Sequence, residues 1–361
     1  MIGVDLFCGA GGMTLGAKLA GVHVVFSVEA DPHSAATYAL NHPEVNLFPM
    51  DIRKLRQIPL CACRQQTVLF GGPPCQGFST SNQRTRNKSN EENWMFREFI
   101  RLTKSWLPDW IVFENVKGIV ETEKGDFLKL ILKSFQELGY TVSPGILNAA
   151  RFGVPQKRER LFVVGSLHGI KVPMPEPTGS KSIPVKNALA DLPELPNGAN
   201  CDLLPYKCAA RSKYARQLRN GETTVSGNLV THNADFVTKR YRHIGHGGNW
   251  EDIPASLMKN YRKDFECHTG IYRRLHPDRP AVVIGNYRKN MLIHPWQHRG
   301  LSVREAARIQ SFPDSYNFSG SIGFQQQQVA NAVPPLLAKA VFQVLLAVNT
   351  QRSNASQTHP H

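Results

Sequence analysis

A single cysteine stands in the segment whose residue types are best suited to chemistry. Residues 67–79 read TVLFGGPPCQGFS, in which a short apolar run stops at two glycines and two prolines and then presents Cys75. Proline lacks a backbone N–H and punctuates structure with glycine, so this backbone continues neither as a helix nor as a strand. A thiol displayed on such a loop can act as a nucleophile. The alternative is an inert thiol in a turn, since most lone cysteines behave as small buried hydrophobes.

Glu114 is the first candidate partner for this thiol. It directly follows an apolar run, residues 109–113, that reads as a buried strand. Open α/β sheets build their sites at the carboxyl ends of their strands, so we expect Glu114 to meet Cys75. Further along, the sequence QKRER contains Arg158 and Arg160. Their guanidinium forks can grip a base carbonyl or a phosphate, and surface charge is the alternative.

The N-terminal residues have the pattern of a nucleoside pocket. Residues 2–7 read as a strand, the glycine-rich stretch 9–12 leads into a helix that ends before Gly21, and a second strand ends in Glu29. Glycines here let backbone N–H groups and a helix N-terminus approach a ligand closely. An acidic residue about 20 positions on can hold ribose hydroxyls. Ordinary tight turns give the same pattern, which also departs from Gly-x-Gly-x-x-Gly because residue 14 is threonine.

The following periodicities predict alternating strands and helices, and therefore an α/β fold. Asp51 follows a short strand, where it can accept a hydrogen bond from an adenine amino group or cap the next turn. Helices are expected over 32–41, 91–106 and 126–138, and strands over 68–70, 109–113, 140–147 and 161–165.

A change in composition and periodicity predicts a second domain. Prolines interrupt any long periodicity after Val172, and residues 173–298 are irregular, basic and rich in histidine and asparagine. Order returns over 299–348, where Ser302–Glu305 has the pattern of a capping box and an apolar helix follows over 336–348. We expect a first domain over 1–172, a second over 173–298, a return to the first over 299–348, and a disordered tail over 349–361.

Composition bounds the class of protein. The chain has 361 residues, of which 41% are hydrophobic, and a formal net charge of +15. The charge favours a polyanionic partner, nucleic acid first, although a merely basic surface is the alternative. No apolar run reaches the roughly 18 residues of a membrane span, and no basic leader is visible, so a cytoplasmic protein is expected. Seven irregularly spaced cysteines indicate reduced thiols, and for Cys61-Ala-Cys63 free thiols are favoured over a metal site.

Taken together, these motifs resemble those of the bacterial-type DNA (cytosine-5)-methyltransferases. The matching segments follow the order of that family from residue 2 to about residue 348, and they are Asp5–Gly12, Gly72–Ser79, Glu114–Val116, Gln156–Arg160 and Gln328–Asn331. The resemblance implies a Rossmann-like S-adenosylmethionine-dependent methyltransferase sheet with helices on both faces, and a smaller irregular target-recognition domain over 173–298.

The resemblance also implies roles for particular residues. Cys75 would add to carbon 6 of a flipped-out cytosine, Glu114 would bind or protonate N3, and Arg160, with Arg158 nearby, would hold O2. S-adenosylmethionine would be the methyl donor, with no metal. The residues implied to hold it are Phe7, Gly9, Gly11, Gly12, Glu29, Asp51, Ile52, Pro74, Met95, Asn331 and Val333. Ala30 follows Glu29 where some relatives carry an aromatic residue, so one stacking contact differs.

Several alternatives stay open at this stage. A transfer-RNA methyltransferase of the same fold is one, although the tripeptide Cys-Phe-Thr associated with that branch is absent and only Cys267-His268-Thr269 occurs. A DNA-binding or dinucleotide-binding protein without methyl transfer is the other. We expect double-stranded DNA as the partner, no membrane, a monomer in the bacterial cytoplasm near the nucleoid, and a cognate restriction endonuclease without a stable complex. No residue of the middle region can be assigned to a base.

Overall fold

The computed structural model describes residues 1–60, 65–74, 94–121, 125–179, 181–258, 271–285, 287–288 and 291–357, with side chains as far as residue 352. Its chain forms two compact units, which are described separately. Unit 1 holds residues 1–152, 159–178 and 335–361, and unit 2 holds residues 153–158 and 179–334. Cys75, Cys61 and Cys63 lie outside the described residues.

Unit 1 is built on a seven-stranded sheet with the order β3-β2-β1-β4-β5-β7-β6. The first five strands in this order are parallel to one another, whereas β7 runs antiparallel to both β5 and β6. This arrangement confirms the predicted Rossmann-like α/β fold. The strands are β1 (Ile2–Leu6), β2 (His23–Glu29), β3 (Asn46–Pro49), β4 (Thr67–Gly71), β5 (Trp110–Val116), β6 (Thr141–Asn148) and β7 (Glu159–Ser166).

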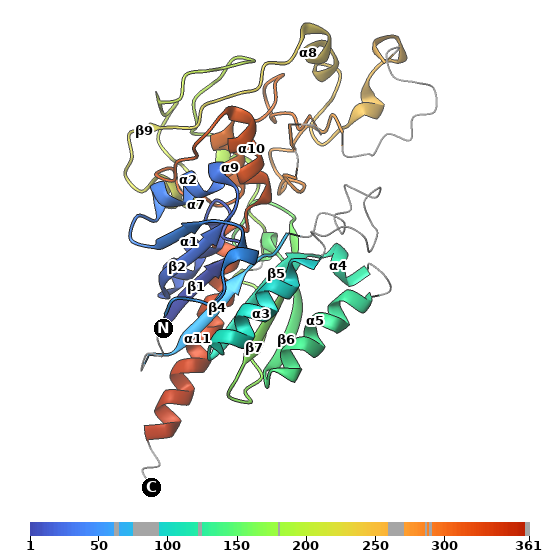
Figure 1. Ribbon diagram of the computed structural model, residues 1–361. Coiled ribbons are helices and arrows are strands. Elements are labelled where there is room, and N and C mark those ends of the chain that lie inside the picture. The colour runs from blue at the N-terminus through green and yellow to red at the C-terminus, as the bar shows by residue number, and fades with distance from the viewer. Residues whose placement is uncertain are drawn as a thin grey trace. The chain divides into compact units, whose positions relative to one another are not determined.

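Helices cover both faces of this sheet (Figure 1). Successive residues of β4 point to opposite sides: Leu69 lies in one core cluster with Phe99 of α3, whereas the ring of Phe70 packs edge-on against Phe342 of α11. The helices of unit 1 are α1 (Gly12–Ala20), α2 (Pro32–Asn41), α3 (Phe96–Trp106), α4 (Gly118–Glu121), α5 (Asp126–Glu137) and α11 (Pro335–Gln357), with the 3₁₀ turns η1 (Ile52–Lys54) and η6 (Ala149–Arg151).

Helix α11 packs directly on α1. A β-carbon added at Gly16 would lie 2.5 Å from Cβ of Ala338 and 2.6 Å from the carbonyl oxygen of Pro335, so only glycine permits this approach. The stretch Ile322–Arg352 is long and apolar enough to cross a membrane, but 61% of its apolar window is buried within the protein. The buried residues of α11 include Leu337, Val341, Phe342 and Leu345. Its apolar character therefore serves the core of unit 1.

Four boundaries differ from those expected. Helix α3 begins at Phe96, later than predicted, and Glu114 lies inside β5 because the strand continues to Val116. Arg160 lies inside β7, which begins at Glu159, and α11 continues to Gln357 where a disordered tail was expected. Other boundaries are confirmed, among them the N-cap of α2, where the Asp31 side chain accepts a hydrogen bond from Ser34 N.

Unit 2 has little regular structure. Its elements are β8 (Leu204–Pro205), β9 (Thr224–Val225), α6 (Lys186–Leu189), α7 (Lys213–Arg219), α8 (Asp235–Tyr241), α9 (Val303–Ile309) and α10 (Ile322–Asn331), with the turns η7 (Trp250–Asp252) and η8 (Ala255–Leu257). The predicted capping box is confirmed at the start of α9, where Ser302 and Glu305 exchange hydrogen bonds with each other's backbone.

Buried arginines take the place of strand ladders in unit 2. Arg274 donates hydrogen bonds to the carbonyl oxygens of Tyr241, Ile244, His294 and Gln297, at distances of 2.6–2.8 Å. Further inside, Arg308 pairs with Asp191 and Asp314. Such side chains donate hydrogen bonds to buried backbone carbonyl oxygens that have no partner in a helix or strand. Part of the positive charge of this region is therefore buried and structural.

Candidate active site

Glu114 and Arg160 form a largely buried ion pair across β5 and β7. The Nε atom of Arg160 lies 3.0 Å from Oε1 of Glu114, and the exposed fractions of the two side chains are 14% and 9%. The register pairs Glu114 with Phe162, so Arg160 is its diagonal neighbour on the same face. Burial lowers the pKa of the Arg160 guanidinium and the Glu114 carboxylate raises it. Arginine keeps its proton in proteins, so a positive charge lies beside the Glu114 carboxyl group.

The segment that leads to Cys75 passes directly beside this carboxylate. A β-carbon added at Gly72 would lie 2.6 Å from Oε2 of Glu114. Next along the chain, the carbonyl oxygen of Pro73 accepts a hydrogen bond of 3.3 Å from Nδ2 of Asn115. Pro74, the last described residue before Cys75, is exposed. Two neighbouring residues of one motif, Gly72 and Pro73, therefore lie against two neighbouring residues of the other, Glu114 and Asn115.

The glycine-rich turn is tied to Glu29. Gly9 N donates to Oε2 of Glu29 at 2.7 Å, and Asp31 N donates to Oε1 at 2.8 Å. Burial raises the pKa of Glu29, and these backbone N–H groups act in the opposite direction. Each carboxylate oxygen can accept more than one hydrogen bond, so the half-buried side chain retains capacity for further donors.

The backbone at this turn is shaped for close approach. Phe7, Gly9 and Gly11 all have positive φ, at 61°, 54° and 85°. Left-handed torsions suit glycine, whereas for Phe7 they are uncommon and cost energy. A β-carbon added at Gly9 would meet no atom within 4 Å, so open space lies beside the turn. Gly12, the first residue of α1, is buried. The turn, the start of α1 and the Glu29 carboxylate thus fit a nucleoside ligand.

Asp51 performs one of its two expected roles. Its Oδ1 accepts a 2.9 Å hydrogen bond from Arg53 N, which caps the turn η1, and its carboxylate pairs with the Arg53 side chain at 2.6 Å. Hydrogen bonding to Arg53 lowers the pKa of Asp51. The neighbouring Ile52 is buried, and Met95 is half-buried at the N-cap of α3. Capping is thus present, and the adenine contact stays a prediction.

Arg158, Asn331 and Val333 belong to unit 2, in contrast to Arg160. The buried Arg158 donates from Nη2 to the carbonyl oxygens of Ala330 and Asn331, at 3.0 and 3.2 Å. The exposed side chain of Asn331 accepts a 2.8 Å hydrogen bond from Gln327 Nε2, and Val333 is half-buried. Arg158 therefore supports the backbone of Gln328–Asn331.

Two positions of this site were missed by sequence reasoning. Gly72 and Asn115 both lie inside quoted motifs, but only Cys75 and Glu114 were singled out there. The signal for Gly72 was the pair of glycines before the prolines, of which Gly72 is the one beside the carboxylate. For Asn115, its place next to Glu114 gave the signal, because an amide at the end of a strand can hold a neighbouring loop.

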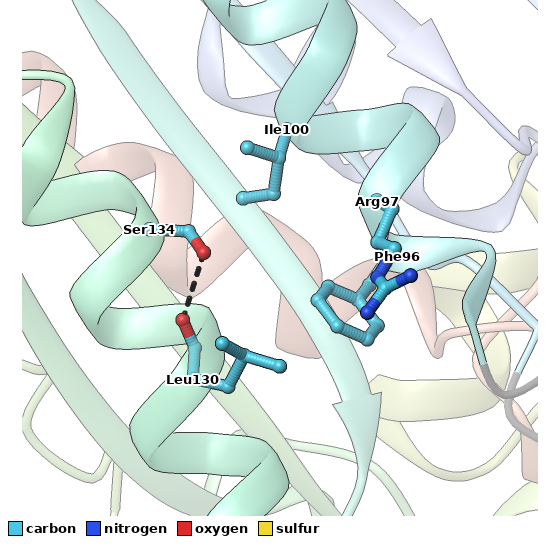
Figure 2. Close-up of a pocket in the computed structure, with 5 residues that line it drawn as sticks. All are labelled: Phe96, Arg97, Ile100, Leu130 and Ser134. Carbon is cyan, nitrogen blue, oxygen red and sulfur yellow. Dashed lines mark hydrogen bonds between the residues drawn. The ribbon is translucent and has the colours of Figure 1, made fainter. Parts of the chain in front are cut away.

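Unit 1 also has a small pocket that is not lined by Glu114 or Glu29. It has a volume of about 120 Å³ between α3 and α5 and is lined by Phe96, Arg97, Ile100, Leu130 and Ser134. Figure 2 shows these side chains, with the Ser134 hydroxyl donating to the carbonyl oxygen of Leu130 at 2.9 Å. Both walls are helix surface, and neither Glu114 nor Glu29 contributes to the lining.

Comparisons with known proteins show which family the chain matches. The model of the family C-5 cytosine-specific DNA methylase matches residues 1–347. The chain is 36% identical to the Type II methyltransferase M1.HphI of Haemophilus parahaemolyticus, over 96% of this chain and 87% of that protein. It is 33% identical to the Type II methyltransferase M.DdeI of Desulfomicrobium norvegicum, over 94% of this chain and 86% of that protein. A solved structure assigned as a prophage-encoded DNA modification methyltransferase of E. coli shares the fold, with a TM-score of 0.78, 24% identity and coverage of 97% and 99% of the two chains.

Proposed function

The chain belongs to the C-5 cytosine-specific DNA methylase family, and from this premise we propose a covalent mechanism with Cys75 as the nucleophile. The protein is a DNA (cytosine-5)-methyltransferase, which uses S-adenosylmethionine and takes DNA as its substrate. The residues that carry out the reaction, the extrusion of the base and the biological setting are parts of the proposal.

Carbon 5 of cytosine is a weak nucleophile until a group adds at carbon 6. The Cys75 thiolate forms a bond to carbon 6, and the electron pair of the 5,6 double bond is placed on carbon 5. Glu114 holds N3, and Arg160 holds O2 as negative charge develops on the ring. S-adenosylmethionine would supply the methyl group to carbon 5 and leave as S-adenosylhomocysteine. Loss of the carbon 5 proton to water and cleavage of the carbon 6–sulfur bond then restore the ring as 5-methylcytosine and return the thiolate.

The ion pair between Glu114 and Arg160 is the observation that carries this proposal. A carboxylate and a guanidinium 3.0 Å apart and largely buried present an acceptor and a row of donors side by side. That pattern complements the N3 and O2 edge of cytosine, provided that N3 carries a proton while Glu114 holds it. Gly72 and Pro73 bring the chain past this pair just before Cys75.

The methyl donor is assigned to the turn and the strand ends of unit 1. Glu29 holds the ribose, Phe7 and the backbone of Gly9, Gly11 and Gly12 line the nucleoside, and Asp51 with Ile52 receives the adenine. The open space beside Gly9 and the remaining acceptor capacity of Glu29 support this assignment. Further residues proposed to line the pocket are Pro74, Met95, Asn331 and Val333.

A cytosine inside a duplex is out of reach of this machinery, so the proposal includes its extrusion from the stack, which costs roughly a few kcal/mol. We assign target recognition to residues 173–298 and catalysis to 1–172 with 299–348. Contacts from the basic middle region would offset the cost of extrusion. The names of the relatives support a restriction-modification setting, with a monomer acting in the cytoplasm beside a separate endonuclease.

Methyl transfer from labelled S-adenosylmethionine to unmethylated genomic DNA and, in parallel, to transfer RNA tests the function. We expect label in DNA, with modified cytosines in one short sequence context. Label in RNA alone would instead support a transfer-RNA methyltransferase, and no label would indicate a binding protein.

The mechanism is tested on a duplex with 5-fluorocytosine at the target position. Fluorine cannot leave carbon 5 as a proton does, so the Cys75 adduct should accumulate and survive denaturing electrophoresis. Cys75→Ser should bind the duplex and form no such adduct. An adduct of undiminished yield with Cys75→Ser would contradict the assignment of the nucleophile.

A further inference from the structure

Arg101 of α3 donates hydrogen bonds to three backbone carbonyl groups of the segment that follows Asp51. Its Nη2 atom donates to the carbonyl oxygens of Leu55 and Ile52, at 2.8 and 3.3 Å, and Nη1 donates to that of Arg56 at 3.1 Å. Nε donates to Oε2 of Glu98, one turn earlier on α3, at 2.8 Å. The guanidinium is thus oriented from one side by a carboxylate and engaged on the other by backbone.

Hydrogen bonds within the segment fix the shape of the turn η1, since Lys54 N donates to Asp51 O at 2.9 Å, Leu55 N to Ile52 O at 3.1 Å and Arg53 N to Asp51 Oδ1 at 2.9 Å. None of these bonds ties the turn to α3. Apolar packing holds the same segment to α3, since Ile52, Leu55 and Phe99 lie in one buried cluster. Apolar packing fixes how closely the segment approaches α3. The planar Arg101 guanidinium, bonded to several carbonyl oxygens, also fixes the orientation of the segment and its position along the helix.

From this geometry we infer that Arg101 is a positioning residue of the methyl-donor pocket: it holds the Asp51–Ile52 backbone where the adenine of the donor is read. The inference rests on the proposed function, which assigns the adenine to these two residues. Arg101 touches neither the donor nor the base in this account. It acts through the carbonyl of Ile52 and through those of the two residues that end the turn.

The consequence is selectivity for the adenine edge. Asp51 can accept a hydrogen bond from the exocyclic amine of adenine, and hypoxanthine carries a carbonyl oxygen at that position. A site whose acceptor is placed to receive a hydrogen bond from an amine rejects an analogue without that amine. It does so only while the acceptor is held in position. Loss of Arg101 should therefore weaken binding and, beyond that, reduce the preference for adenine over hypoxanthine.

The test compares two ligands on the full-length protein without DNA. S-adenosylhomocysteine and S-inosylhomocysteine are titrated calorimetrically into the wild type, Arg101→Met and Lys104→Met. Lys104 is exposed on the same helix, so its substitution removes one positive charge from α3 without touching the gripped segment. We expect Kd for S-adenosylhomocysteine to rise about tenfold in Arg101→Met and the preference for adenine to fall toward twofold or less, with Lys104→Met like the wild type.

One result would overturn the inference: a preference for adenine that is unchanged in Arg101→Met, whether both dissociation constants stay the same or rise by the same factor, as a merely structural role would produce. Should Arg101→Met fail to fold, Arg101→Lys keeps the positive charge and removes the planar guanidinium. An undiminished preference for adenine in Arg101→Lys would equally contradict the inference. A wild type that methylates DNA and shows no preference would refute the adenine assignment together with this inference. A wild type that transfers no methyl group would instead refute the proposed function.

Discussion

A β-carbon on Gly72 would lie 2.6 Å from Oε2 of Glu114, so the backbone that leads to Cys75 is in contact with the carboxylate proposed to hold the base. Real β-carbons do not approach an oxygen so closely. The absence of a side chain at Gly72 therefore leaves room for the Glu114 carboxylate in its present position. It also leaves the Glu114 carboxylate between Gly72 on one side and Arg160 on the other.

Gly72→Ala should impair catalysis with little effect on donor binding. The new methyl group displaces the Glu114 carboxylate, and a displacement of about 1 Å in a catalytic group can lower kcat about 100-fold. Steady-state methyl transfer to DNA and titration with S-adenosylhomocysteine measure the two quantities. Gly179→Ala is the matched control, because a β-carbon there meets no atom within 4 Å. Equal kcat in both variants would show that the contact does not matter.

Breaking the ion pair should destabilise unit 1. Arg160→Met leaves the Glu114 carboxylate without its guanidinium in a largely buried place, which we expect to lower the free energy of unfolding by about 2–4 kcal/mol. Glu114→Gln alone leaves the guanidinium uncompensated, so the double variant should lose less than the sum of the single losses. Urea denaturation of the four proteins measures this, and strictly additive losses would mean that the two side chains do not interact.

Arg158 should prove structural. Arg158→Lys loses the planar fork that reaches the carbonyl oxygens of Ala330 and Asn331, and we expect the free energy of unfolding to fall by about 1–3 kcal/mol. The exposed neighbour Lys157, changed to methionine, is the control and should leave stability unchanged. If Arg158→Lys instead kept full stability while losing methyl transfer, Arg158 would be a catalytic residue as the sequence suggested.

The parallel half of the sheet could be predicted because its signals are local. Each strand is an apolar run followed within a few residues by glycine, proline or an acidic residue, and Asp31 marks the start of α2 by its own hydrogen bond. The placement of Glu114 inside β5 was missed for a non-local reason. Asn115 and Val116 extend the strand only because Leu161 and Arg160 pair with them antiparallel, and no local pattern contains that register.

The roles of the charged residues were the least predictable. Arg158 and Arg160 are two residues apart and were given one role, but the first donates to backbone carbonyls in unit 2 and the second pairs with Glu114 in unit 1. Likewise, the net charge of the chain favoured a polyanionic partner, whereas Arg274 and Arg308 of unit 2 are buried. Composition counts charges and does not show which of them find carbonyl or carboxylate partners inside the protein.

His294 should make the stability of the protein depend on pH. Its Nδ1 atom accepts hydrogen bonds from the backbone N–H groups of Trp296 and Gln297, at 3.3 and 3.1 Å, so this nitrogen carries no proton. The other ring nitrogen, Nε2, lies 3.5 Å from Oε1 of Glu305. Burial lowers the pKa of His294 to about 4, with Arg299 and Arg274 acting in the same direction and Glu305 against it. The folded protein therefore holds a neutral imidazole at neutral pH.

The sign of the effect follows from the two protonation states. The unfolded chain binds a proton at this histidine near pH 6.5, whereas the folded chain does so only near pH 4. The stabilisation is thus complete above about pH 6.5 and is lost as the pH falls toward 4, by up to about 3 kcal/mol. Urea unfolding between pH 7 and 4 should show this loss, and His294→Asn, whose side-chain oxygen can accept the same N–H groups, should flatten it. The exposed His243, changed to asparagine, should leave the slope as in the wild type, and a slope unchanged in His294→Asn would assign the pH dependence to other groups.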